Sequence, residues 1–300
     1  MSAAGPQESL APTYRLLTPA DIPGAQRLRE LAKWNQTEQD WRNLLAFDPR
    51  GCFGAELDGA LVGTATAIRF IPERGRGSFG WVGMVLVDPE KRRFGIGSTL
   101  LKKCIAYLQA SGVETVKLDA TPLGKQVYDK LGFTDEYKLE RWEGEAQKVP
   151  GGVYGPWTLS ALAASDLDPL TAYDTPVFGA QRRAVLQAWR EGWPECAVVA
   201  REGSRITGYG LARRGSSFHQ IGPLIGDSPG LCEALLMHLL EQLQGERVIV
   251  DLVTEHPWSV PLAKRCNLRH QRPFIRMALG PNSSPGQLQK VLAICCPEVG

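Results

Sequence analysis

The sequence predicts an α/β chain (a mixed sheet of the α+β kind) made of two similar units in tandem. Each unit is expected to hold a mostly antiparallel central sheet flanked by helices. The chain has 300 residues, and domains centre on roughly 100–150 residues, so two are expected. A faint internal repeat supports this division: residues 61–63 recur as 206–208, and residues 116–119 recur as 248–251. Because such matches keep their order along the chain, chance explains them poorly.

The first unit alternates strand and helix signals. Thr18 can cap a helix whose apolar residues fall at helical spacing. Asp58-Gly59 is a strong two-residue hairpin signal between two strands. The strand at 81–87 is apolar throughout, which is typical of a central strand. The expected elements are a helix from Thr18, strands at 54–57, 61–68, 81–87 and 116–118, a helix after Gly97 and a short helix at 125–131.

The second unit repeats this pattern, with strands at 197–200, 206–212, 220–225 and 248–253 and a helix at 231–243. Between the units lies a stretch rich in Gly and Pro, a composition typical of linkers. The predicted organisation is a flexible N-terminus at 1–12, a first unit at 13–143, a linker at 144–156, a second unit at 157–280 and a C-terminal tail at 281–300.

Composition excludes several classes of function. Lys plus Arg number 34 and Asp plus Glu 32, a formal net charge of +2. This balance gives no electrostatic reason to expect a nucleic acid or an anionic membrane as partner. No apolar run approaches the roughly 18 residues of a membrane helix, and we see no secretory signal, so a cytoplasmic protein is expected. None of the seven cysteines sits in a C-x-x-C pair, and five of them lie in apolar surroundings and are expected to be reduced core thiols: Cys52, Cys104, Cys196, Cys232 and Cys266. No His pair has metal-ligand spacing, so no metal is expected.

One segment carries a chemical signal. After the apolar strand at 81–87 comes a basic loop with Arg92, Arg93, Gly95 and Gly97, and then a helix. Glycines let backbone N–H groups converge, the helix start adds partial positive charge, and the arginines add full charges. Together these features predict an anion site suited to a diphosphate, although a solvated basic turn stays open. The loop is neither a Walker P-loop nor G-x-G-x-x-G.

The pattern Arg92-x-x-Gly95-x-Gly97 after residues 85–89 resembles the acetyl-CoA loop of the GNAT superfamily of N-acetyltransferases. Downstream, residues 128–133 (Tyr-Asp-Lys-Leu-Gly-Phe) are similar to that family's late helix and its closing Gly-Phe. The two motifs stand in the family's order. The resemblance covers residues 13–140 in full, and residues 157–279 resemble a second, degenerate unit.

This resemblance implies acetyl-CoA as co-substrate. Thr121 stands where the family often has an Asn that contacts the pantetheine amides, and Tyr128 matches the family's general acid. A phenol near the sulfur can protonate the departing thiolate. Backbone groups of Val85, Leu86 and Val87 would hold the pantetheine arm, and the diphosphate would be held by Arg92, Arg93, Phe94, Gly95, Ile96, Gly97 and Ser98.

A general base is harder to find. Residues 81–84 hold no carboxylate, so the nearest candidate is Asp119, with a water-mediated base as the alternative. Trp34, Asn35 and Trp41 fall in the region that covers the acceptor cleft in GNAT folds, so they are expected to wall the acceptor site. Ordinary core packing is the competing interpretation, because Trp34 and Trp41 also fit one helix face.

The second unit has lost the loop, because four residues, including the basic ones, are missing after Asp227, and Ala263 stands at the counterpart of Tyr128. The expected function is acetyl transfer from acetyl-CoA to the amine of a small molecule by direct attack, with the chemistry in the first unit. Two alternatives stay open: acetylation of protein lysines or N-termini, and a non-catalytic acyl-CoA sensor.

Overall fold

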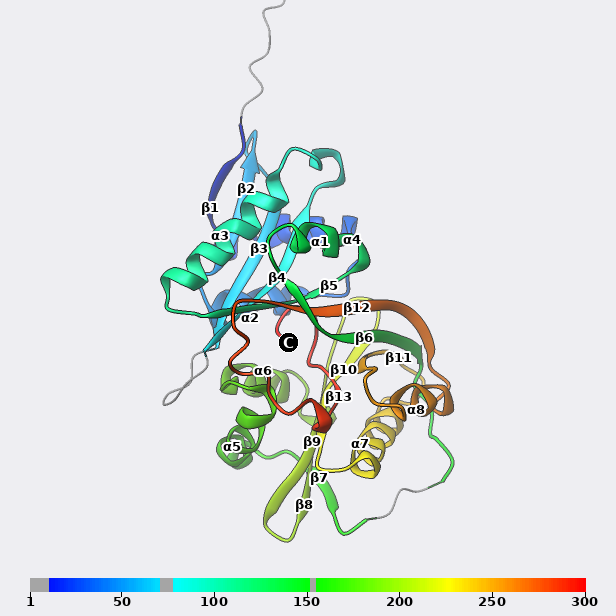
Figure 1. Ribbon diagram of the computed structural model, residues 1–300. Helices are drawn as coiled ribbons and strands as arrows, with labels where there is room; N and C mark the ends of the chain where they lie inside the picture. The colour runs from blue at the N-terminus through cyan, green and yellow to red at the C-terminus, as the bar shows by residue number, and fades with distance from the viewer. Residues whose placement is uncertain (1–10, 71–77, 152–154) are drawn as a thin grey trace, which may run out of the picture.

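The computed structural model describes residues 11–70, 78–151 and 155–300 (Figure 1). The first half of the chain contains β1 (Thr13–Leu16), α1 (Ile22–Leu31), α2 (Glu38–Phe47), β2 (Cys52–Leu57), β3 (Ala60–Phe70), β4 (Phe79–Val87), α3 (Ile96–Ala110), β5 (Thr115–Ala120), α4 (Pro122–Asp129) and β6 (Thr134–Glu145). The second half contains β7 (Thr158–Ala161), α5 (Leu167–Phe178), α6 (Arg183–Gly192), β8 (Ala197–Glu202), β9 (Arg205–Arg213), β10 (His219–Gly226), α7 (Pro229–Gln242), β11 (Arg247–Val253), α8 (Ser259–Arg265), β12 (Arg269–Leu279) and β13 (Val291–Ala293).

Local sequence explains several of these elements. Asp58 and Gly59 both adopt left-handed φ angles, +52° and +75°, as the predicted hairpin turn requires. Thr37 and Asp40 form a capping box at the start of α2, in which the Asp40 carboxylate accepts from the Thr37 backbone N–H at 2.6 Å. Helix α2 was not predicted from the sequence, although this Thr-x-x-Asp signal is present there.

The described strands form one continuous sheet of thirteen, in the order β1-β2-β3-β4-β5-β12-β6-β11-β13-β10-β9-β8-β7. The last long strand of each half lies against the other half: β12 is inserted between β5 and β6, and β6 pairs with β11. The predicted domain bounds, 13–143 and 157–280, therefore describe the repeat in the sequence. In the structure, each of these units contributes a strand to the sheet of the other. The linker at 144–156 likewise begins inside β6, and Ala146 beyond it is buried.

A buried ion pair joins the exchanged strands. Arg276 on β12 donates to both carboxylate oxygens of Asp119 on β5, each at 2.9 Å. The Asp119 side chain is fully buried and that of Arg276 nearly so. The Arg276 guanidinium also lies 4.5 Å from the ring centroid of Trp81 on β4. Residues from three strands and both halves are thus tied together in one place.

Both halves contain a pair of parallel strands that separate. β4 and β5 pair only between residues 79–81 and 115–117, and β10 and β11 only between residues 219–221 and 248–250. In the second half β13 enters the gap, where Ala293 pairs with Leu224 on one side and Leu252 on the other. The predicted C-terminal tail is therefore part of the core, with residues 292–296 buried.

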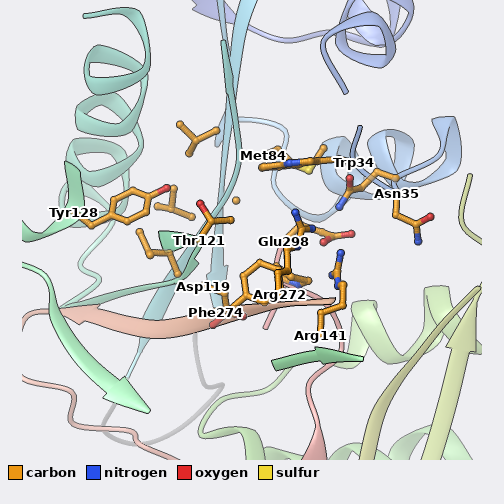
Figure 2. A pocket seen from close by; sticks show the side chains of 16 residues that line it. Trp34, Asn35, Met84, Asp119, Thr121, Tyr128, Arg141, Arg272, Phe274 and Glu298 are labelled. Carbon is orange, nitrogen blue, oxygen red and sulfur yellow. The ribbon is translucent and has the colours of Figure 1, made fainter. Parts of the chain in front are cut away.

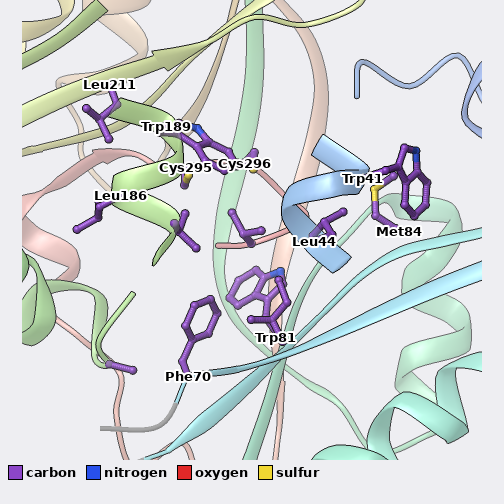
Figure 3. Packing of buried hydrophobic residues seen from close by; sticks show 14 of the residues in the cluster. Trp41, Leu44, Phe70, Trp81, Met84, Leu186, Trp189, Leu211, Cys295 and Cys296 are labelled. Atoms are coloured by element: carbon purple, nitrogen blue, oxygen red, sulfur yellow. The ribbon is translucent and has the colours of Figure 1, made fainter. Parts of the chain in front are cut away.

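A hydrophobic cluster spans the two halves on one face of the sheet (Figure 3). It joins Trp41 and Leu44 on α2 to Trp189 on α6 through Cys295 and Cys296 of the tail. All seven cysteines are buried and free, and Cys295 and Cys296 belong to this cluster. Within the described ranges, no helix combines the length and apolar character needed to cross a membrane.

The strand exchange predicts that the two halves unfold together. Arg276→Gln should lower the free energy of unfolding by about 3–5 kcal/mol, because it leaves the buried Asp119 carboxylate without its partner. Chemical denaturation followed by both fluorescence and circular dichroism should still show one shared transition. The matched control is Arg269→Gln on the same strand, whose side chain is 79% exposed and whose loss should cost about 0–1 kcal/mol. Two separated transitions in the native protein would contradict this account.

Candidate active site

An open cleft of about 860 Å³ lies where β4 and β5 separate. Its wall includes nearly all the residues that the sequence assigned to the acetyl-CoA site. Phe94 is the exception, since it is 75% exposed and lies outside the wall. The assigned residues that line the cleft are Val85, Leu86, Val87, Arg92, Arg93, Gly95, Ile96, Gly97, Ser98, Thr121 and Tyr128.

The basic loop is shaped around the start of α3. Arg93 and Gly95 have left-handed φ angles of +69° and +77°, and α3 begins directly after them and runs for 15 residues. A Cβ placed on Gly95 would meet nothing within 4 Å, so the space in front of the helix is open. Arg92 and Arg93 make no ion pair with any carboxylate of the described chain. Free N–H groups and unpaired cations at one helix start fit an anionic ligand.

Tyr128 approaches the cleft from α4 (Figure 2). Its hydroxyl makes no hydrogen bond to another described residue, and its ring packs against Phe133 at 5.8 Å between centroids. Burial raises the pKa of the Tyr128 hydroxyl to about 12, so the group stays protonated at neutral pH and can donate a proton. Thr121 caps the same helix: its hydroxyl oxygen accepts from the Gly124 N–H at 3.2 Å.

Asp119 does not fit the role of general base. It is among the residues that line the cleft, but its fully buried carboxylate is held by Arg276 through both oxygens. Burial raises the pKa of Asp119 despite this partner. A base must reach the acceptor amine, and here both oxygens already serve a structural ion pair. The sequence could place Asp119 at the end of β5 but not choose the direction of its side chain.

The structure does not bring all three predicted acceptor-site residues, Trp34, Asn35 and Trp41, to one pocket. Trp34 and Asn35 line a smaller inner pocket that adjoins the cleft. The Asn35 side chain also holds the second half, because its amide donates to the Phe218 carbonyl at 2.9 Å and accepts from the Ser217 and Phe218 N–H groups. Trp41 is only 1% exposed and lines neither space, so the prediction is wrong for this residue and core packing is the correct interpretation. It packs near Met84, which does line the inner pocket (Figure 3).

Sequence reasoning missed the far side of the inner pocket. Arg141 comes from β6, Arg272 and Phe274 come from β12, and Glu298 comes from the C-terminal tail. Figure 2 shows these side chains across the pocket from Tyr128. No local motif marks them, because the exchanged strands and the tail bring them together from distant parts of the chain.

The second half offers no equivalent site. The space between β10 and β11 is taken by β13, and α7 starts with a Ser228 cap in place of a basic loop. Ala263, the counterpart of Tyr128, is fully buried on α8. Across the ranges that the structure describes, no group of three or more His, Cys, Asp or Glu side chains is placed to hold a metal ion.

Comparison with known proteins agrees with this architecture. Residues 14–133 match the acetyltransferase (GNAT) family, and residues 170–293 match an acetyltransferase (GNAT) domain. The chain therefore belongs to the GNAT superfamily and carries two such domains in tandem, as the sequence predicted. Proteins of this class are acyltransferases, and the chain is an enzyme of that kind.

Two relatives and one solved structure illustrate the similarity. A holothin acyltransferase of Pseudoalteromonas is 24% identical over 94% of this chain and 93% of its own length. An uncharacterized N-acetyltransferase of Bacillus subtilis is 28% identical, but the match covers 58% of this chain and 61% of the relative. The crystal structure of a putative acetyltransferase from Pyrococcus horikoshii superposes with a TM-score of 0.80 at 23% identity, covering 99% and 100% of the two chains. This last similarity establishes the shared fold alone.

Proposed function

We propose that this enzyme transfers the acetyl group of acetyl-CoA to the amine of a small molecule, in the cleft between β4 and β5. One observation carries the proposal: of the two strand separations, the one between β4 and β5 combines an open cleft, a basic glycine-containing loop and a Tyr128 hydroxyl without a hydrogen-bond partner among the described residues. In the other, between β10 and β11, the chain's own β13 takes the gap.

The cleft fits acetyl-CoA in two respects. Beyond Trp81, β4 pairs with β3 on one side only, so its other edge, at Val85 to Val87, faces the cleft without a partner strand. At the end of this edge, the Val87 carbonyl accepts a hydrogen bond from Arg92 Nε at 3.3 Å. An extended pantetheine arm can pair there as an added strand does. The diphosphate would lie at the start of α3, near Arg92 and Arg93, where charge-assisted contacts contribute about 1.5–3 kcal/mol each.

Acetyl-CoA would supply an activated thioester, and the chain's residues would position it and move protons. The amine attacks the thioester carbonyl, so that a C–N bond forms and the C–S bond breaks. Tyr128 gives its proton to the departing thiolate and regains one from water, while the amine nitrogen loses one proton. Two carboxylates line the inner pocket, Asp119 and Glu298, and only Glu298 has an oxygen without a hydrogen-bond partner among the described residues. Glu298 therefore replaces Asp119 as the candidate general base, the group that accepts the proton of the amine.

A small acceptor is favoured over a protein. The inner pocket that adjoins Tyr128 has a volume of only about 50 Å³, which admits a head group of a few atoms, whereas sites for whole small molecules span roughly 300–1,000 Å³. Its walls come from both halves of the chain and from the tail. A purely sensory role gives no reason for an unpaired, protonated Tyr128 hydroxyl in the cleft.

Gly95→Asp should weaken acetyl-CoA binding at least tenfold. Aspartate tolerates the left-handed backbone at this position, and its carboxylate would stand where the diphosphate is expected. The matched control is Gly112→Asp at the other end of α3, which has a φ of +82° and equally open surroundings. Calorimetric titration of both variants provides the measurement. Equal affinity in the two folded variants would move the diphosphate site elsewhere.

Tyr128→Phe should lower kcat about 10²-fold and leave the affinity for acetyl-CoA nearly unchanged. Phenylalanine keeps the ring and its packing against Phe133, so the change removes only the proton donor. Thiol release gives the rate and calorimetry the affinity. The control is Tyr14→Phe, a ring on β1 away from the cleft. A Tyr128→Phe rate equal to that of the native enzyme would make Tyr128 a packing residue.

A further inference from the structure

Buried polar atoms without partners gather in the inner pocket. Glu298 is 3% exposed; Arg213 donates to its Oε1 at 2.8 Å, while its Oε2 has no hydrogen-bond partner. The Nε of Arg272 and the Oε1 of Gln36 are also buried without partners, and all three side chains line the pocket. Buried polar atoms are normally paired with protein, water or a ligand, so three such atoms lining one pocket are available to a molecule bound there. Two acceptors and one charged donor therefore call for a ligand with complementary groups.

The position of Glu298 depends on the tail. The tail crosses β4 at Gly83, where a Cβ would come within 2.8 Å of the Glu298 carbonyl oxygen. The Trp81 indole N–H holds the tail in place, because it donates to the Pro297 carbonyl at 2.9 Å. Only a glycine on β4 allows this approach. The tail thus brings a carboxylate to a strand segment that has none of its own.

Beside the tail, the same side of the pocket carries two arginines. Arg141 on β6 and Arg272 on β12 are direct cross-strand partners, and like charges in such a position destabilise a sheet. Asp251 neutralises Arg141 through two hydrogen bonds of 2.7 and 2.8 Å. Arg272 makes no ion pair with any described carboxylate, and burial together with Arg141 lowers the pKa of Arg272 to about 10.

The space outside the inner pocket is also lined by positively charged side chains. A second space of about 460 Å³ shares Trp34, Asn35, Arg141 and Arg272 with the inner pocket and opens beyond it. Its lining adds two further cations, Lys33 and Arg247, and contains no carboxylate. A route into the site with this lining favours anionic molecules and disfavours cationic ones such as polyamines.

We propose that the acceptor is an amine that also carries an anionic group, with Arg272 binding the anion and Glu298 Oε2 receiving a hydrogen bond from the amine. This inference rests on the proposed acetyl transfer and adds the chemical class of the acceptor. The anion is a carboxylate or a phosphate, because Arg272 can bind either through charge-assisted bonds. The inner pocket takes the head group and the outer space the remainder of the molecule.

The test uses matched pairs of amines that differ by one anionic group. Suitable pairs are L-phenylalanine with 2-phenylethylamine, L-leucine with 3-methylbutylamine, and glucosamine 6-phosphate with glucosamine. The first two pairs test a carboxylate and the third a phosphate. Thiol release gives kcat/KM for each member, and calorimetry on the CoA-saturated protein gives its affinity without requiring turnover.

For at least one pair, the native enzyme should favour the anionic member at least tenfold. Arg272→Gln should bring that ratio to about one and should not lower the melting temperature, because it removes a half-buried charge that has no ion-pair partner among the described residues. Glu298→Gln should weaken both members of the pair to a similar extent. Arg269→Gln, three residues away on β12 and exposed, should leave the ratio unchanged, and all three variants should bind acetyl-CoA as the native protein does.

Equal use of both members in every pair, or an unchanged preference in Arg272→Gln, would overturn the assignment of the acceptor class. Absence of binding for every amine in calorimetry would overturn it as well. A separate result would contradict the proposed function: acetyl-CoA binds and the anionic amines bind with the Arg272-dependent preference, yet no acetyl transfer occurs. The two failures are therefore distinguishable.

Discussion

Two parallel strands that separate leave backbone N–H and C=O groups unpaired inside a folded protein, and such groups must find partners. This requirement arises twice in the chain, between β4 and β5 and between β10 and β11. The second separation is satisfied internally, because β13 pairs with both flanking strands. The first is left as a cleft. The same structural feature thus becomes part of the core in one half and an open cleft in the other.

The exchange of β6 and β12 gives the second half a role in that site. Without it, Arg272 and Phe274 would belong to a sheet far from Tyr128. With it, β12 lies beside β5, and the tail that leaves the gap next to β10 continues past Gly83 of β4. The gap between β10 and β11 of the second half is filled by β13, and this half instead builds the side of the pocket on which we place the acceptor.

How far the sequence could predict this structure depends on the range of the interactions involved. The turn at Asp58 and Gly59 and the loop before α3 are set by neighbouring residues, so both were predicted. Side-chain direction at Asp119 depends on Arg276, a partner 157 residues away, and the burial of Trp41 depends on packing against the second half. Both site assignments therefore failed. Arg272 and Glu298 reach the pocket through strand exchange and the path of the tail, which no local pattern encodes.

The central claim is that the chain has one open acyl-CoA cleft and one closed by its own C-terminal strand. The most direct test is a calorimetric titration of the full-length protein with acetyl-CoA. The account predicts one site per chain, and it predicts that Gly95→Asp weakens that single site with no second site remaining. Two equivalent sites per chain, or a full site that persists unchanged in Gly95→Asp, would contradict it.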